Sequence, residues 1–156
     1  MAYWLMKSEP DTFGIDDLEA RPKQTEPWNG VRNFQARNFI KQMKPGDLAF
    51  FYHSSCEIPG VAGICEIVTD AYPDPTQFDR KSDYYDEKSK PEHPRWYLVD
   101  VKYQRHFKRV VALAELREHA AKLGGFKLLS AGRLSVMPVT PEHWNFILSL
   151  EKKPSP

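Results

Sequence analysis

Short apolar stretches separated by polar turns run along the chain and predict a sheet of short strands. Residues 3–7 (YWLMK) are apolar and aromatic, as in a buried strand, and Pro10 ends the pattern because proline cannot donate to a strand ladder. Residues 96–104 alternate instead: every second side chain from Tyr97 to Tyr103 is apolar or aromatic, which is typical of a half-buried strand. Similar patterns predict further strands at residues 47–54, 61–72, 107–113 and 133–139.

Four segments carry helical signals. The clearest begins at Asn33, a favourable N-cap residue, and ends at the Pro45–Gly46 pair. Its apolar side chains recur at intervals of three and four, at Ala36, Phe39, Ile40 and Met43. Further helices are expected at residues 15–20, at residues 113–123 and after the Thr140–Pro141 pair.

The order of these elements indicates the fold class. Residues 21–30 and 73–95 show neither the alternation of a strand nor the spacing of a helix, so they are expected to be loops. The segment 73–95 contains four prolines. Short strands interrupted by helices, without regular βαβ alternation, predict a mixed α+β domain around one curled sheet. We expect a single domain over residues 1–150 and a frayed tail over residues 151–156. The shared core should include Phe39, Ile40, Val99, Val101 and Ile147.

Net charge limits the kind of partner. The 156 residues carry a net charge of +1, whereas a protein that binds duplex nucleic acid through many phosphates is usually strongly basic. Local charge is less even, and two groups of basic residues stand out. One group is Lys102, Arg105, Lys108 and Arg109, and the other is Arg32, Arg37, Lys41 and Lys44. Either group, taken alone, is typical of a solvated surface.

The termini and cysteines predict a cytoplasmic protein. No apolar run approaches the roughly 20 residues of a membrane helix, and the N-terminus has no basic lead or long apolar stretch of a signal peptide. Cys56 and Cys65 have eight residues between them and form no CxxC pair. We therefore expect reduced thiols, no bound metal and no cofactor.

The sequence offers little support for catalysis. It has no GxSxG, P-loop, HExxH or glycine-rich dinucleotide motif. Candidate bases are Glu9 and His53, and the candidate nucleophiles are Ser8, Ser54, Cys56 and Ser135. His53 and Ser54 are neighbours on a strand, so their side chains point to opposite faces and cannot pair directly. We expect a protein that is not an enzyme.

The hexapeptide WNGVRN at residues 28–33 favours a binding site. A small flat ligand needs an aromatic wall and a few fixed polar groups that read its edge. Trp28 is either that wall or a core residue, and the sequence leaves both open. The polar groups at strand ends that could read an edge are Ser8, Glu9, Asn33 and His53. Arg32 or Arg133 could meet a phosphate.

Four blocks in order resemble the EVE domain family of the PUA-like superfamily, which is distantly related to the YTH readers of methylated adenine. The blocks are YWLMKSEP near the N-terminus, WNGVRNFQARNFIKQMKPGD, FFYHS and RLSVMPV, and they span essentially the whole chain. The resemblance implies a PUA-like, curved, barrel-like sheet of five to six strands with helices at its edges.

The resemblance also implies one pocket that receives a single nucleobase, in particular a modified one. By motif position its residues would be Lys7, Ser8, Glu9, Trp28, Val31, Arg32, Asn33, Tyr52, His53, Ser54, Arg133, Leu134 and Ser135. The expected partner is RNA or DNA, single-stranded or with an extruded base, bound by a monomer. Two alternatives stay open: an enzyme that acts on a modified nucleotide through Glu9 or His53, and a sensor of a free nucleoside or other small molecule.

Overall fold

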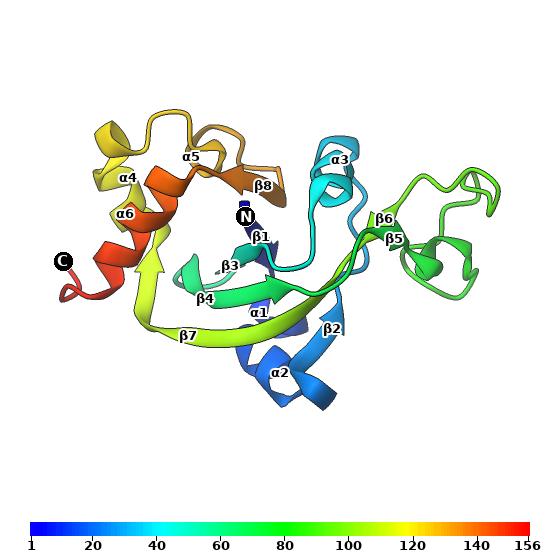
Figure 1. Cartoon of the computed structure of the whole chain (residues 1–156), viewed down its shortest axis with the longest axis horizontal. Coiled ribbons are helices and arrows are strands. Elements are labelled where there is room, and N and C mark those ends of the chain that lie inside the picture. The colour runs from blue at the N-terminus through cyan, green and yellow to red at the C-terminus, as the bar shows by residue number, and fades with distance from the viewer.

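Eight strands and six α-helices follow one another irregularly in the computed structural model, which describes residues 1–156 (Figure 1). The strands are β1 (Tyr3–Ser8), β2 (Thr25–Pro27), β3 (Leu48–His53), β4 (Gly60–Ile67), β5 (Tyr72–Pro73), β6 (Tyr97–Leu98), β7 (Asp100–Ala112) and β8 (Val136–Val139). The helices are α1 (Pro10–Phe13), α2 (Ile15–Ala20), α3 (Phe34–Gln42), α4 (Leu113–Glu118), α5 (Lys127–Ser130) and α6 (Pro141–Glu151). Three short 3₁₀ helices lie at Pro22–Gln24, Pro75–Phe78 and Ala120–Lys122.

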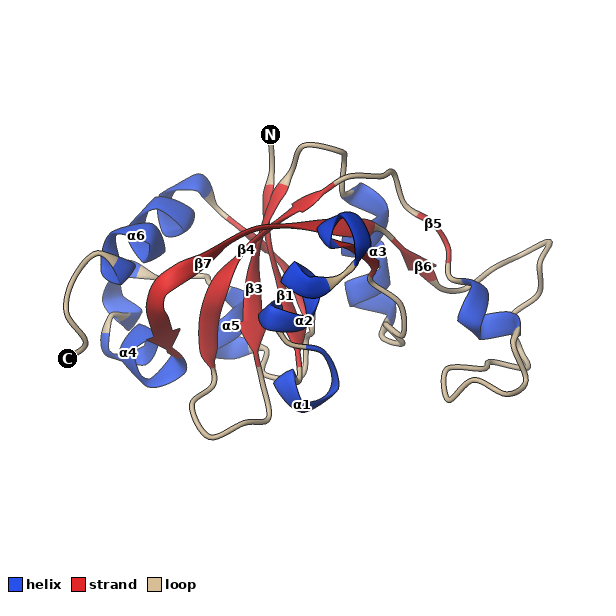
Figure 2. Ribbon diagram, turned by 90° about the horizontal axis from the view of Figure 1, so that it is seen from below, coloured by secondary structure: helices blue, strands red, loops and turns tan.

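One six-stranded sheet in the order β2-β7-β4-β3-β1-β8 forms the frame of the molecule. It curls into a half-barrel, as the α+β prediction requires (Figures 1 and 2). Every neighbouring pair is antiparallel except β1 and β3, which run parallel. A parallel pair needs a long crossover, and residues 9–47 supply it. In Figure 1, α2 and β2 lie below the long β7, whereas α3, α5 and α6 lie above it.

The core fills the hollow of the sheet. Ile40, Val99, Val101 and Ile147 are fully buried, as predicted, and Phe39 is partly buried and packs against the same cluster. Burial of these side chains supplies most of the driving force for the fold, at roughly 25 cal/mol per Å² of apolar surface.

The strongest local signals are confirmed. The Asn33 side chain caps α3 by accepting a hydrogen bond from the Ala36 backbone N–H at 2.9 Å. Thr140 caps α6 in the same way, with Pro141 in its first turn. The helix at residues 15–20 also forms with the expected bounds.

Two strands expected at 96–104 and 107–113 are instead parts of one, β7, which continues through the polar residues Gln104, Arg105 and His106. Register shifts against β4 let the long strand bend where the sheet curls. Tyr97 and Leu98 do not belong to this sheet, because they pair with β5 in a separate ribbon.

Four other expectations were wrong in part. Residues 25–27, expected in a loop, form the edge strand β2, and the strand expected to reach residue 72 ends at Ile67. The helix expected over 113–123 breaks into α4 and a 3₁₀ turn, and the strand expected from residue 133 begins at Val136. Competing tertiary contacts decide such boundaries, so local propensity alone sets them poorly.

The last helix extends into the segment that was expected to be a frayed tail. Glu151, assigned from the sequence to the tail, is the buried last residue of α6 and forms an ion pair with Arg105 at 2.6 Å.

Both Cys56 and Cys65 are free, and burial raises the pKa of the Cys65 thiol to about 12. None of the helices has the length and apolar character needed to span a bilayer.

Gly63 in β4 lies so close to α2 and β7 that a substitution there tests the packing of the sheet. A Cβ at this position would lie 2.2 Å from Ile15 Cδ1 and 2.3 Å from the Arg105 carbonyl oxygen. Gly63→Ala should therefore lower the free energy of unfolding by about 1–3 kcal/mol, the usual cost of overpacking. Gly124→Ala is the control, because no heavy atom lies within 4 Å of its added Cβ. Urea denaturation of both variants measures the difference, and equal stability of the two would contradict this packing.

Candidate functional site

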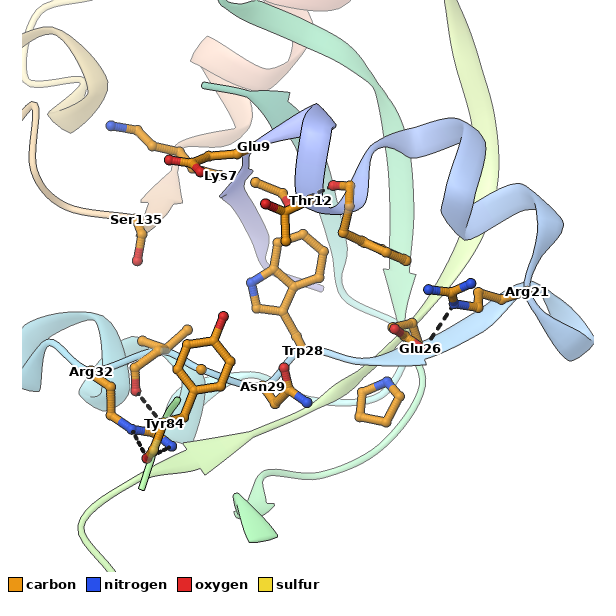
Figure 3. Close-up of a pocket in the computed structure, with 15 residues that line it drawn as sticks. Lys7, Glu9, Thr12, Arg21, Glu26, Trp28, Asn29, Arg32, Tyr84 and Ser135 are labelled. Atoms are coloured by element: carbon orange, nitrogen blue, oxygen red, sulfur yellow. Dashed lines mark hydrogen bonds and ion pairs between the residues drawn. The ribbon is translucent and has the colours of Figure 1, made fainter. Parts of the chain in front are cut away.

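A cavity of about 600 Å³ opens beside the end of β1 (Figure 3). Its walls come from the crossover between β1 and β3, from the loop that follows β5 and from the residue before β8. The lining residues are Lys7, Ser8, Glu9, Thr12, Phe13, Arg21, Glu26, Pro27, Trp28, Asn29, Gly30, Val31, Arg32, Tyr84 and Ser135. A cavity of this size and mixed lining is typical of a site for one small ligand.

Several polar groups of the cavity have no partner within the protein. They are the Glu9 carboxylate, the Thr12 hydroxyl, the Trp28 indole N–H, the Asn29 amide and the Ser135 hydroxyl. No fully buried side-chain nitrogen or oxygen lacks a hydrogen bond, so these unbonded groups are open to the cavity. They supply one anionic acceptor, one obligate donor and three groups that both donate and accept.

Other polar residues of the lining are engaged in the fold. The Ser8 hydroxyl donates to the Phe13 carbonyl at 2.6 Å, and the Lys7 ammonium donates to the Gly132 carbonyl at 2.9 Å. Burial lowers the pKa of Lys7, because the charged form loses hydration. Arg21 and Glu26 form an ion pair at 3.4 Å on the rim.

Of the two roles that the sequence left open, Trp28 takes that of a core residue. Its side chain is only 7% exposed and meets the Phe51 ring edge-on, with centroids 5.4 Å apart. A second edge contact, at 6.5 Å, joins it to Phe13. Trp28 is therefore a core residue whose indole N–H borders the cavity, and it does not offer a broad open face for stacking.

Tyr84 supplies the exposed aromatic wall that the sequence did not reveal. The ring lies directly over Gly30, where an added Cβ would come within 2.6 Å of it. Gly30 also has φ +87°, a conformation that favours glycine. The Tyr84 side chain remains 40% exposed. Nothing in the irregular segment around Tyr84 signals this contact, although Gly30 itself marks a close approach.

Arg32 holds this wall in place. All five N–H groups of a guanidinium are used: Nε and Nη2 donate to the Tyr84 carbonyl, Nη1 to Asp74 and to the Val31 carbonyl, and Nη2 also to Thr76. In this arrangement Arg32, which the sequence suggested could meet a phosphate, has no donor left for one. Its role is to fasten the hexapeptide to the loop that carries Tyr84.

The Asp74 carboxylate is the partner that makes this fastening possible. Its side chain is fully buried and accepts hydrogen bonds from the Thr76 hydroxyl, the Thr76 and Gly30 backbone N–H groups, and Arg32. Burial alone would raise the pKa of Asp74, but these four bonds together hold that pKa below its ordinary value.

Six of the residues expected in the pocket lie outside it. Asn33, Arg133 and Leu134 border a separate hollow of about 310 Å³ at the start of α3. The others, Tyr52, His53 and Ser54, line neither space. Burial raises the pKa of the Tyr52 phenol to about 12. The Ser54 backbone N–H donates to the Ser8 carbonyl, which continues the pairing of β1 with β3.

His53 serves the fold. Its Nε2 accepts a hydrogen bond from the Ile15 backbone N–H at 3.1 Å, which requires the neutral ring. Burial, with a smaller contribution from His106, lowers the pKa of His53 against the opposing influence of the Asp16 and Asp17 carboxylates. Glu9 and His53, the bases considered for catalysis, are therefore not assembled at one site.

A curled half-barrel sheet with one parallel strand pair, and a polar and aromatic cavity beside the end of β1, define the class as a small α+β domain of the half-barrel type. The EVE domain model matches residues 2–150, and the chain belongs to the EVE domain family.

Named relatives support this assignment along the whole chain. Thymocyte nuclear protein 1 of Danio rerio is 51% identical, over 96% of this chain and 72% of that protein, and its human counterpart is 49% identical, over 97% and 75%. Among solved structures, human THYN1 in complex with 5-methylcytosine containing DNA matches with a TM-score of 0.97 and 46% identity, over 99% of this chain and all of that chain. A Pseudomonas putida protein matches with a TM-score of 0.91 and 50% identity, over 96% and 99%.

The Arg32 bonds predict a large effect of a substitution that keeps the charge. Arg32→Lys removes the planar fork that spans Asp74, Thr76 and the Tyr84 carbonyl, so we expect a loss of about 1–3 kcal/mol in the free energy of unfolding. Arg133→Lys is the matched control, because Arg133 is exposed and should change stability by less than about 0.5 kcal/mol. Chemical denaturation compares them, and equal losses would show that the Arg32 bonds are dispensable.

His53 predicts a dependence of stability on pH. Its pKa is lower in the folded chain than in the unfolded chain, where it is about 6.5. The stability from the neutral ring is therefore complete above that value and declines as the pH falls below it. Between pH 7.5 and 5, the melting temperature of His53→Gln, which keeps an acceptor without titrating, should fall less than that of the parent. His93→Gln, at an exposed site, should behave like the parent; a parent-like His53→Gln would refute the assignment.

Proposed function

We propose that this EVE domain binds DNA by holding one modified cytosine, extruded from the helix or already unpaired, in the 600 Å³ cavity. The observation that carries the proposal is the set of unpartnered polar groups beside an exposed aromatic wall. The similarity to human THYN1, whose structure contains 5-methylcytosine DNA, supports both the partner and the base.

The cavity has groups that suit the edge of cytosine. Cytosine offers an amino group as donor and a ring nitrogen and carbonyl as acceptors. The unbonded Glu9 carboxylate accepts from an exocyclic amine, as acidic residues do in other cytosine contacts. The Trp28 indole N–H and the Ser135 hydroxyl supply donors for the acceptor atoms, and the Tyr84 ring supplies the face on which the base stacks.

The energetics favour a base that leaves its helix easily. Extrusion costs a few kcal/mol, and least for mismatched or single-stranded bases. Stacking on an aromatic ring returns about 1–3 kcal/mol. A protein that gains affinity from one enclosed base needs few phosphate contacts, which agrees with the net charge of +1.

No catalytic step is part of this proposal. The Ser8 hydroxyl is bonded to the Phe13 carbonyl and His53 lies outside the cavity, so these two candidate groups are not assembled as a nucleophile and its base. A reader of this kind returns its ligand unchanged.

Glu9→Gln is the sharpest test. The variant replaces the anionic acceptor with an amide of the same size, and the base contact should weaken by about 1–3 kcal/mol. Fluorescence anisotropy with a short single-stranded DNA that contains one 5-methylcytosine measures the affinity. The parent should also bind this DNA more tightly than the same DNA with unmodified cytosine.

Glu118→Gln is the control, because it makes the same charge change at an exposed site away from the cavity. Equal effects of the two variants would argue for a general electrostatic contribution and against a base contact at Glu9. Equal affinity for methylated and unmodified DNA would refute the proposed base. Binding of the free nucleoside as tightly as the DNA would favour a small-molecule sensor.

A further inference from the structure

The structure treats the two basic groups of the sequence differently. In the group at residues 102–109, both arginines are neutralised by buried glutamates. Arg105 pairs with Glu151 at 2.6 Å and Arg109 with Glu115 at 2.7 Å. These arginines anchor α6 and α4 to β7, so half of the charge of that group serves the fold.

The other basic group leaves cations available on α3. The helix contains no acidic residue. Arg37 and Lys41, one turn apart, form no ion pair with a carboxylate, and Lys41 is exposed. Arg37 donates to the Asn38 side chain and the Arg95 carbonyl through three of its five N–H groups, so two remain.

Each of these cations lies over an aromatic ring. The Arg37 guanidinium is 5.0 Å from the centre of the Phe34 ring, and the Lys41 ammonium is 4.7 Å from that of Tyr97. Phe34 is 53% exposed, although its ring stacks on Trp96 with centroids 4.8 Å apart. Cations that alternate with aromatic rings, one of them exposed, are typical of surfaces that hold single-stranded nucleic acid.

This surface is continuous with the cavity. The Arg32 guanidinium lies 5.4 Å from the Tyr84 ring, which lines the cavity, and 5.5 Å from the Trp96 ring. The Trp96 ring in turn stacks on the Phe34 ring. A column of rings and cations therefore runs from the cavity wall to the exposed face of α3, which stands beside the β5–β6 ribbon in Figure 1.

We propose that the α3 face formed by Phe34, Arg37 and Lys41 binds the DNA strand that flanks the base in the cavity. The exposed part of the Phe34 ring, which Trp96 and Arg37 do not cover, packs against a neighbouring unpaired base, and Arg37 and Lys41 meet its phosphates. The inference rests on the proposed function, because the column matters only if a base occupies the cavity. An acidic peptide would satisfy the cations but would leave the Phe34 ring without a planar partner, so the strand is the better match.

Two variants test the stacking and the phosphate binding separately. Phe34→Leu keeps an apolar side chain but removes the stacking ring, and should weaken binding of a 5-methylcytosine oligonucleotide about 5- to 150-fold. Arg37→Gln combined with Lys41→Gln should make the plot of log affinity against log salt shallower, by about 0.7 for each phosphate of a single strand that is no longer neutralised. Lys102→Gln, an exposed charge change on β7, should leave both quantities unchanged.

The free nucleoside 5-methyl-2′-deoxycytidine, observed by NMR titration, separates this inference from the proposed function. If both hold, the nucleoside binds equally to parent and α3 variants, while the oligonucleotide discriminates between them. If the parent binds neither ligand, the proposed function fails and the flanking contact fails with it. If the parent binds the oligonucleotide and the α3 variants bind it equally well, only the flanking contact is overturned. Equal weakening for both ligands, with lowered melting temperatures, would give α3 a purely structural role.

Discussion

The buried carboxylate of Asp74 is the constraint on which the cavity depends. A fully desolvated charge is tolerated only when its lone pairs are occupied, and here Thr76, Gly30 and Arg32 occupy them. The same bonds draw the hexapeptide at 28–33 against the loop that follows β5. Without the carboxylate, Arg32 would be a partly buried cation without its ionic partner, and the hexapeptide would lose two of the bonds that hold it against the loop carrying Tyr84.

The cavity lining therefore divides into groups that hold the structure and groups that remain free. Arg32 and Ser8 have little capacity left for a ligand, although both border the cavity. Glu9, the Trp28 indole N–H and Ser135 are unbonded. This division lets the cavity keep its shape while empty, because the wall does not rely on the groups proposed to meet the base. A preformed site of this kind loses little conformational entropy when it is filled.

Local signals in the sequence were sufficient for the two capped helices but not for the site. The Asn33 cap and the Thr140–Pro141 start depend on residues a few positions apart, and both formed as predicted. The contact of Tyr84 with Gly30 joins distant segments, one of which has no periodic pattern, so no local rule could find it. The family resemblance located Glu9, Trp28 and Ser135 at the cavity. It also included His53, whose part in the fold became visible only through its bond to the Ile15 backbone.

The crossover between the parallel strands also has a consequence for how the protein folds during its synthesis. The cavity takes residues from the end of β1, from the crossover, from Tyr84 and from Ser135, close to the last strand. Closing so long a connection costs conformational entropy, and this cost arises before the contacts between the parallel strands can stabilise the pair. Because synthesis runs from the N-terminus, the residues of β1 to β7 are all made before Ser135 and β8. The lining of the cavity is therefore incomplete until the segment that holds Ser135 has been made.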